Sequence, residues 1–288
     1  MYEITPKHDF FVGIDSDGCV FDTMELKHKE CFIPNIINSY ELQSISKYAR
    51  EAAEFVNLYS KSRGINRFPA LVETLEWLQK RPEVKARGVT ITVPQSLAKW
   101  IAEETKLGNP ALEKIVQETG DIDLAHALKW SIAVNETIAS MVRGVPPFPM
   151  VHESLAKMAA KADMVVCSAT PNEALEAEWK EHDVAKYVVA ICGQEAGSKK
   201  ETLTNAKKYG ENKSLMIGDA PGDFKAAQAN NTLFYPINPG NEEASWQRFH
   251  DEAIDKFFDG SFAGDYQKML LDEFDSYLPE KPSFKLIG

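Results

Sequence analysis

The sequence lacks several features that would assign it at once to a class of protein. It has no run of about 18 apolar residues, so no transmembrane helix is expected. Residues 1–18 contain no basic segment, and their apolar stretch, 10–14, is too short for a secretion signal, so we expect a cytoplasmic protein. No two cysteines form a C-x-x-C pair, which argues against a zinc knuckle or a redox dithiol. Cys167 and Cys192 end apolar runs and are expected to be small core residues. The cysteines are Cys19, Cys31, Cys167 and Cys192.

Positive charge is also scarce. The 288 residues include 32 Lys and Arg against 43 Asp and Glu, and the formal net charge is −11. Proteins that bind a nucleic-acid backbone need clustered cations, so this balance argues against that function, although small anionic substrates remain possible. Hydrophobic residues make up 44% of the chain and charged residues 26%, which is typical of folded globular proteins. The length allows one large domain or two ordinary ones.

Five short apolar runs predict the strands of a buried parallel sheet. Their apolarity is continuous rather than alternating, as in strands that are covered on both faces. Helical patterns at 174–182, 200–209 and 223–229 separate the later runs, and this βαβ order is typical of a doubly wound, Rossmann-like α/β fold. The five runs are 10–14, 164–168, 187–191, 214–218 and 232–237.

A long helical block separates the first run from the others. RGVTITV, at 87–93, is the one stretch of this block that is compatible with a short strand. The Pro-rich stretch VPPFPM, at 145–150, closes the block before a helix at 152–162 leads back into the sheet. Helices are predicted within the block at 35–62, 69–81, 95–107, 110–118 and 122–142.

This order predicts an inserted domain. We expect a discontinuous α/β core, formed by residues 1–23 and 146–288, and an all-helical domain over residues 24–145. The segment from 241 to 278 is expected to add helices at the end of the core.

Acidic residues follow the first and fourth predicted strands, at the edge where ligands of open α/β sheets bind. In FFVGIDSDG, Asp15 and Asp17 are two residues apart, so an extended chain directs both side chains to the same side. Gly18 would let backbone N–H groups approach an anion. In SLMIGDAPGD, Asp219 has the equivalent place and Asp223 begins a helix. Several carboxylates beside an anionic substrate need a cation, and Mg²⁺ prefers oxygen ligands.

Two further segments supply polar and cationic groups. Ser168 ends the second predicted strand, in VVCSAT, and can donate its hydroxyl proton. In GSKKETL, either Lys199 or Lys200 can place a positive charge at the start of a helix.

Four motifs follow one another along the chain: DxDGxxxDT, an apolar strand that ends in Ser, a Lys, and GDxxxD. In this order they resemble the motifs of the haloacid dehalogenase superfamily. The fold of that superfamily, with a helical cap inserted after the first strand, matches the one expected here. A calcium loop also contains DxDG, but it would need a Glu nine residues after its Gly, where this chain has Lys27. The resemblance implies a phosphohydrolase in which Asp15 is the nucleophile that forms an aspartyl-phosphate and Asp17 is the acid and base.

The resemblance also implies the ligands of metal and phosphate. Mg²⁺ would be held by Asp15, the backbone carbonyl of Asp17, Asp219 and, directly or through water, Asp223. Ser168 and a lysine would stabilise the phosphoryl oxygens. Lys199 fits the spacing K-x-x-x-L better, and Lys200 stays an alternative. The residues expected to contact the phosphate are Gly18, Ser168, Ala169 and Lys199.

We therefore expect a Mg²⁺-dependent phosphatase of a small phosphorylated metabolite, acting as a monomer or weak homodimer without nucleic-acid or membrane partners. A phosphomutase of the β-phosphoglucomutase type is an alternative, which Lys27 disfavours because those relatives have histidine at this place. A non-catalytic sugar-phosphate-binding protein is another alternative. Within the helical block, a group of cations is expected either to recognise the substrate or to form a solvated helix end; they are Lys47, Lys61, Arg63 and Arg67.

Overall fold

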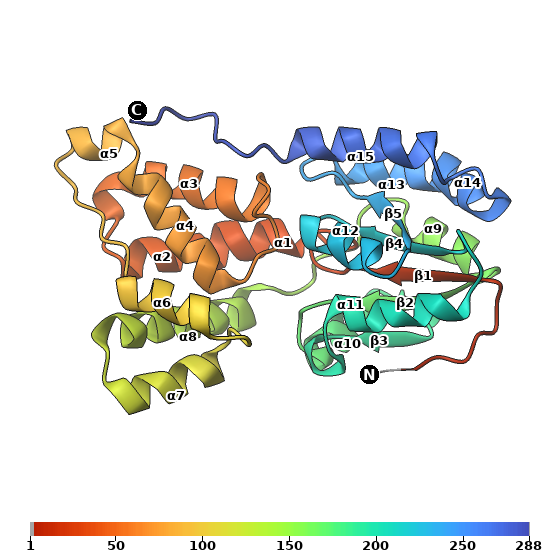
Figure 1. The fold of residues 1–288 in the computed structure, drawn as a ribbon, viewed down its shortest axis with the longest axis horizontal. Helices are drawn as coiled ribbons and strands as arrows, with labels where there is room; N and C mark the ends of the chain where they lie inside the picture. Colours follow the sequence, from red (N-terminus) through yellow and green to blue (C-terminus); the bar gives the residue numbers. More distant parts are fainter. Residues whose placement is uncertain (1–2, 288) are drawn as a thin grey trace. The chain divides into compact units, whose positions relative to one another are not determined.

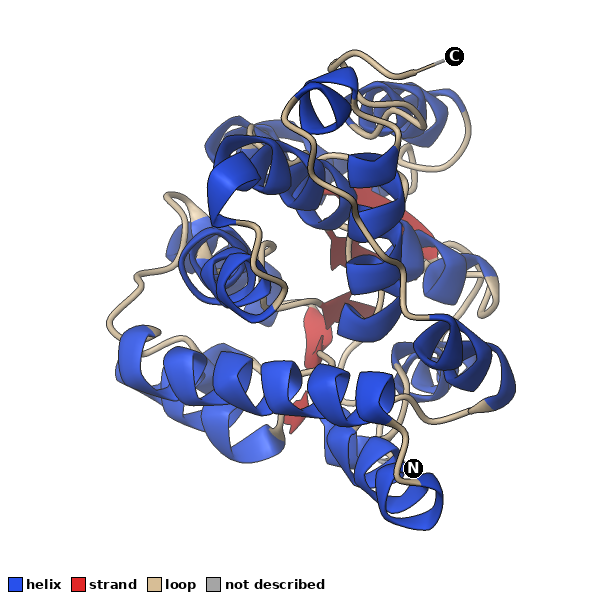
Figure 2. Cartoon of the chain, turned by 90° about the vertical axis from the view of Figure 1, so that its left-hand side faces the viewer, coloured by secondary structure: helices blue, strands red, loops and turns tan. Residues whose placement is uncertain are grey.

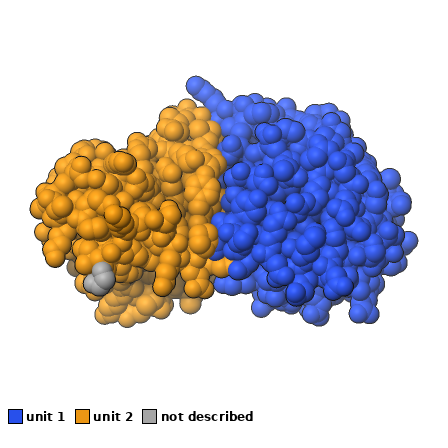
Figure 3. All heavy atoms as spheres, turned by 90° about the horizontal axis from the view of Figure 1, so that it is seen from above, with its two compact units in different colours: residues 1–24, 143–278 blue, residues 25–142, 279–288 orange. Residues whose placement is uncertain are grey.

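The computed structural model describes residues 3–287 and divides into two compact units, coloured separately in Figure 3. The first unit runs to Met24 and resumes over Arg143–Leu278. The second comprises Glu25–Val142 and the chain from Pro279 onward. Figure 2 shows that strands form one small part of the chain and that helices form most of the rest.

The first unit is built on a parallel five-stranded sheet (Figure 1). Its strands lie in the order β3-β2-β1-β4-β5, and the central residue Val12 of β1 is opposite Met164 of β2 and Leu215 of β4. The predicted Rossmann-like α/β fold is therefore confirmed. The strands are β1 Phe10–Ile14, β2 Ala162–Cys167, β3 Ala190–Cys192, β4 Ser214–Gly218 and β5 Leu233–Pro236.

Both faces of this sheet are buried, which explains the continuous apolar runs. On β1, Phe11 points into one apolar cluster, whereas Val12 and Ile14 point into another. The second face is covered by α9 (Val151–Ala159), α10 (Asn172–Glu181), α13 (Glu242–Arg248), α14 (Ile254–Asp259) and the π-helical turn η6 (Phe249–Ala253). The first face is covered by α12 (Pro221–Gln228) and the 3₁₀ turn η5 (Leu203–Lys208). Helix α15 (Asp265–Tyr277) contributes Phe274 to the first cluster and Leu270 to the second.

The helical elements of the first unit follow the predicted order. They are α1 Thr23–Leu26, which crosses into the second unit, then α9 Val151–Ala159, α10 Asn172–Glu181, η3 Ala185–Tyr187, η4 Gln194–Ala196, α11 Lys199–Thr202, η5 Leu203–Lys208, α12 Pro221–Gln228, α13 Glu242–Arg248, η6 Phe249–Ala253, α14 Ile254–Asp259 and α15 Asp265–Tyr277.

Asp163 of β2 fixes the N-terminal segment to the sheet. This side chain is 1% exposed and accepts hydrogen bonds from the backbone N–H groups of Lys7 (2.8 Å) and His8 (3.1 Å) and from the Tyr209 hydroxyl (2.8 Å). Burial opposes ionisation of Asp163, but these donors outweigh it and lower the pKa of the carboxyl below its usual value.

The second unit is helical in the part of the chain that is described, and one apolar cluster joins its helices. Its largest fully buried side chains include Trp130 and Phe68. Its elements are η1 Lys27–Phe32, which is π-helical, α2 Ile33–Ser39, η2 Gln43–Ile45, α3 Ser46–Leu58, α4 Arg67–Gln79, α5 Pro82–Ala86, α6 Gln95–Glu103, α7 Asn109–Thr119 and α8 Ile122–Met141.

The single helix predicted at 35–62 is wrong, because the chain breaks between α2 and α3. Glu41 has a left-handed backbone with φ of 53°, and the Leu42 N–H donates to the Ile37 carbonyl (2.9 Å). This bond closes the end of α2 in the manner of a Schellman motif. Glycine or asparagine usually marks that position, so the sequence carried no signal for the break.

The stretch 87–93 forms no strand. Ile91 and Val93 are buried among the helices, which gives the stretch its alternating pattern, but the Ile91 carbonyl accepts from the Gln79 side chain (2.9 Å) instead of from a partner strand. Within residues 3–287, no helix is long and apolar enough to cross a membrane.

The C-terminal segment packs on the helices of the second unit. Arg81 is 2% exposed, and its guanidinium lies over the rings of Tyr48 (4.7 Å) and Phe284 (4.1 Å). Phe284 also meets Phe55 edge to face, and the Ile287 N–H donates to the Lys80 carbonyl (2.7 Å). The helical unit is therefore completed by residues that follow the last helix of the first unit.

Candidate active site

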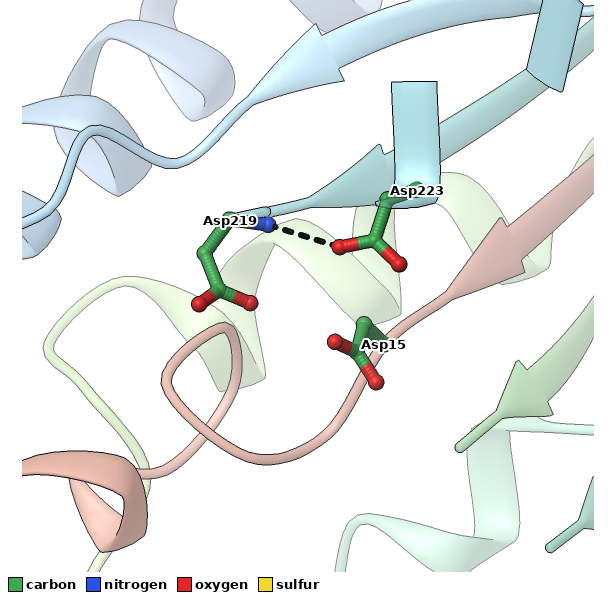
Figure 4. Close-up of side chains that lie close together, drawn as sticks. All are labelled: Asp15, Asp219 and Asp223. Carbon is green, nitrogen blue, oxygen red and sulfur yellow. Dashed lines mark hydrogen bonds between the residues drawn. The ribbon is translucent and has the colours of Figure 1, made fainter. Parts of the chain in front are cut away.

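Three buried carboxylates lie together at the carboxyl ends of the two central strands (Figure 4). Asp15 follows β1, Asp219 follows β4, and Asp223 lies in the first turn of α12. One oxygen of each lies within 4.8 Å of the others. Strand order reverses between β1 and β4, which is where ligands bind in open α/β sheets.

The local chain geometry fixes these carboxylates. The Asp15 N–H donates to the Ile217 carbonyl (3.0 Å), so the β1–β4 pairing extends to the functional residue. One oxygen of Asp223 accepts from the N–H groups of Asp219 (3.2 Å) and Ala220 (3.1 Å). Asp223 lies so close to Gly218 that a Cβ atom there would come within 2.5 Å of its carboxylate, so only glycine fits.

Lys199 is the cation of the site. Its Nζ lies 2.7 Å from Oδ2 of Asp15 and 2.5 Å from Oδ1 of Asp223. A capping box of Ser198 and Glu201 begins α11 one residue before it. Lys200, the alternative, is exposed. Burial opposes the charge of Lys199, but the two carboxylates outweigh it and raise its pKa well above the usual value, so the ammonium is retained.

The charge of the cluster bears on metal binding. Burial and the nearby carboxylates of Asp223 and Asp219 raise the pKa of Asp15 well above its usual value, against the opposing effect of Lys199. Three carboxylates face one ammonium, so full ionisation leaves two uncompensated negative charges in a buried place. A divalent cation with oxygen ligands would compensate them, so the donor set fits Mg²⁺.

The Asp17 side chain is bound by two hydroxyl groups and is not one of the three clustered carboxylates. Its Oδ1 accepts from the Thr23 hydroxyl (2.5 Å) and its Oδ2 from the Thr170 hydroxyl (2.7 Å). Gly18 has φ of 74°, and its N–H donates to the Phe21 carbonyl (2.8 Å), which closes the turn. The side chain of Asp17 thus faces hydroxyl donors, and only its backbone carbonyl stays a predicted metal ligand.

The predicted phosphate contacts lie on the loop after β2. Ser168 is 4% exposed, its N–H donates to the Cys192 carbonyl (3.0 Å), and its Oγ accepts from the Thr170 N–H (3.2 Å). Ala169 is exposed. The Ser168 hydroxyl proton is therefore available for an anion, and the roles of Gly18, Ser168 and Ala169 toward phosphate stay predictions.

Sequence reasoning missed the two threonines that hold Asp17. Thr23 belongs to the motif DxDGxxxDT, and Thr170 stands two residues after Ser168, so their places in the motifs offered a signal. It also missed Ser16, which is fully buried between the two aspartates, and the tryptophan that bonds to it. That contact joins segments 163 residues apart, and no local pattern predicts it.

Two of the four cations expected either to recognise a substrate or to form a solvated helix end are bound within the helical unit. Arg63 is 2% exposed and donates to the Leu58 carbonyl (2.8 Å). Arg67 donates to the hydroxyl of Ser131 (2.9 Å) and the side chain of Asn135 (2.7 Å). Arg63 and Arg67 thus stabilise helix packing, and neither forms a solvated helix end.

Comparison with known proteins supports the resemblance seen in the motifs. The model of the haloacid dehalogenase-like hydrolase family matches residues 96–235, a region that includes Ser168, Lys199, Asp219 and Asp223. No curated protein matches the chain.

Similar solved structures include two predicted phosphoglycolate phosphatases. The one from Lactobacillus delbrueckii subsp. bulgaricus is 13% identical, with 86% of this chain and 98% of that chain covered and a TM-score of 0.48. The one from Haemophilus somnus is 12% identical, with coverages of 80% and 86% and a TM-score of 0.44. A haloacid dehalogenase-like family protein from Streptococcus pneumoniae is 9% identical, with coverages of 86% and 98% and a TM-score of 0.43.

Proposed function

We propose that this chain, whose residues 96–235 match the haloacid dehalogenase-like hydrolase family, is a Mg²⁺-dependent phosphohydrolase of a small phosphate monoester. The observation that carries this proposal is the cluster of Asp15, Asp219 and Asp223 with Lys199 in contact with two of them. A buried acidic cluster with an ammonium beside the nucleophile suits a negatively charged substrate that binds together with a cation.

The proposed reaction has two steps. In the first, a carboxylate oxygen of Asp15 bonds to phosphorus while the bond from phosphorus to the leaving oxygen breaks, and Asp17 gives that oxygen a proton. In the second, Asp17 takes a proton from water, the water oxygen bonds to phosphorus, and the bond from phosphorus to Asp15 breaks. The hydroxyls of Thr23 and Thr170 hold the Asp17 carboxylate in place between its two tasks.

Lys199 and Ser168 would orient the phosphoryl group during both steps. The Lys199 ammonium lies against Asp15, so a phosphoryl group that is attacked by Asp15 meets this charge directly. Asp223 accepts from Lys199 and from two backbone N–H groups, and it therefore fixes the ammonium. When bound among the carboxylates, Mg²⁺ would supply charge compensation at the phosphoryl oxygens.

The test is phosphate release from a panel of phosphorylated metabolites, with and without Mg²⁺. We expect Mg²⁺-dependent release that Asp15→Asn abolishes, while Asp9→Asn, an exposed aspartate just before the other end of β1, retains it. An isomerised product would instead indicate a phosphomutase, and binding without turnover would indicate a sensor. Release that is unchanged in Asp15→Asn would refute the proposal.

A second readout does not depend on finding the substrate. Asp15→Asn should raise the unfolding midpoint of the metal-free protein, because it neutralises one of three clustered buried carboxylates. The same change should reduce the stabilisation by Mg²⁺, which for wild type at about 100 times its dissociation constant is roughly 2.7 kcal/mol. Asp9→Asn should change neither quantity.

We also propose that residues 24–145 serve as the cap that the family resemblance implies and that substrate choice depends on them. Their helical content and separate core support this role. The reducing cytoplasm is our proposed location, which the four free, buried cysteines support.

A further inference from the structure

Ser16 lies between the two proposed catalytic aspartates in the chain, and its N–H, its carbonyl and its hydroxyl group are all hydrogen-bonded. Its N–H donates to Oδ1 of Asp15 (2.8 Å). Its carbonyl accepts from the N–H groups of Cys19 (3.3 Å), Val20 (2.9 Å) and Phe21 (3.2 Å), which winds the chain into a tight loop directly after β1. Ser16 is fully buried and is bonded in the chain to Asp15 and Asp17, so its position fixes the backbone from which both aspartate side chains extend.

Trp179 of α10 holds the side chain of Ser16. The indole Nε1–H donates to the Ser16 Oγ at 2.9 Å, and the Ser16 hydroxyl in turn donates to Oε2 of Glu178 at 3.4 Å. Trp179 is fully buried and lies edge to face against Phe21, at 6.1 Å between ring centroids. Since an indole N–H can only donate, this contact fixes the direction of the hydrogen bond and leaves the Ser16 proton for Glu178.

Trp246 of α13 holds the same loop three residues further along. Its Nε1–H donates to the Cys19 carbonyl at 2.7 Å, and its side chain is fully buried. The two indoles come from different helices that cover the same face of the sheet. The loop from Asp15 to Cys19 is thus bonded to the packed core at a side chain and at a carbonyl.

We infer that Trp179 and Trp246 are positioning residues, which hold the Asp15–Cys19 loop in the conformation that binds Mg²⁺ and the phosphoryl group. This inference rests on the proposed function. The two residues act through Ser16 and Cys19 and do not themselves touch the three carboxylates. A loop that is hydrogen-bonded to buried indoles is restrained by the helices that carry them. Misplacement of a reacting group by about 1 Å can lower the rate roughly 10²-fold.

The test replaces each indole by a side chain of similar shape without its donor. Trp179→Phe and Trp246→Phe should lower kcat by about 10- to 100-fold with KM changed little, because the substrate groups away from phosphorus keep their contacts. Both variants should weaken Mg²⁺ binding in calorimetry without substrate, and both should speed hydrogen exchange of a peptide covering residues 15–21.

Trp130→Phe is the matched control. Trp130 is equally buried, lies in the helical unit, and its indole N–H donates to no group within the described residues. The control should leave kcat, Mg²⁺ affinity and exchange of 15–21 unchanged. A double-mutant cycle of Ser16→Ala with Trp179→Phe should show effects that do not add, because both changes remove the same hydrogen bond.

Two outcomes separate this inference from the proposed function. If Trp179→Phe and Trp246→Phe fold and match Trp130→Phe in Mg²⁺ affinity and in exchange of 15–21, the inference is overturned whatever the activity. If wild type releases no phosphate from any substrate, but the two variants weaken Mg²⁺ binding and speed loop exchange, the proposed function fails and the holding of the loop stands.

Discussion

Gly218→Ala tests how rigidly the carboxylate cluster is built. A Cβ atom on residue 218 would lie 2.5 Å from both Cβ and Oδ2 of Asp223, distances that no packed atoms keep. Asp223 is fully buried at the start of a helix, so it has no open space into which to move. The substitution must therefore displace its carboxylate or the strand end.

The size of the effect follows from what Asp223 would lose. Its oxygens accept from the N–H groups of Asp219 and Ala220 and from the ammonium of Lys199. Hydrogen bonds to a charged group are worth about 1.5–3 kcal/mol each, and breaking a buried charge pair costs about 3–5 kcal/mol. We expect the free energy of unfolding of Gly218→Ala to fall by about 3–5 kcal/mol, and kcat to fall by at least about 10²-fold because Lys199 loses one of its two partners.

Gly222→Ala is the internal control, since it makes the same change four residues along the chain. A Cβ atom at Gly222 meets nothing within 4 Å, and alanine favours the helix there by about 0.4–1 kcal/mol. Urea unfolding in EDTA, calorimetric Mg²⁺ titration and steady-state kinetics should be measured for both variants. If Gly218→Ala unfolds within about 0.5 kcal/mol of wild type and keeps its kcat, the close contact with Asp223 does not constrain the site.

Three further predictions follow from other contacts. Lys199→Met should lower kcat by at least about 10²-fold in steady-state assays, whereas Lys200→Met should match wild type, because only the first ammonium meets the carboxylates. Asp163→Asn should be less stable than wild type near neutral pH. Its deficit in thermal unfolding should disappear as the pH falls below the usual carboxyl pKa of 3.8, because a lowered pKa stabilises the fold only while the group is ionised. Phe284→Ala should reduce the free energy of unfolding by about 1–3 kcal/mol in urea, through lost packing and the lost contact with Arg81.

The sheet was predictable because its strands are buried on both faces. Each of the five apolar runs contains one strand or most of one, and β2 and β3 differ from their predicted ranges by only a few residues at each end. The helical unit was less predictable. Its break at Glu41 uses a residue that seldom adopts a left-handed backbone, and the buried alternation at 87–93 comes from helix packing.

For the site, sequence reasoning located the residues that stand at strand ends. Asp15 and Asp219 follow the neighbouring strands β1 and β4, so a parallel sheet brings them together without further information. The choice between Lys199 and Lys200 depends on the start of α11, which the sequence alone left open. The contacts of Trp179 and Trp246 with the loop span 163 and 227 residues, and only the packed structure joins them.

The docking of Phe284 and Ile287 affects how the protein can be cut and labelled. The helical unit consists of two separate stretches of the gene, so a fragment or chimera that carries only Glu25–Val142 would leave the Arg81 guanidinium without one of its two aromatic rings. A dye attached at residue 287 would lie beside Lys80 of the helical unit, although Arg143–Leu278, which precedes this segment in the chain, belongs to the other unit. A label at residue 287 paired with one on α9 would therefore report the distance between the two units.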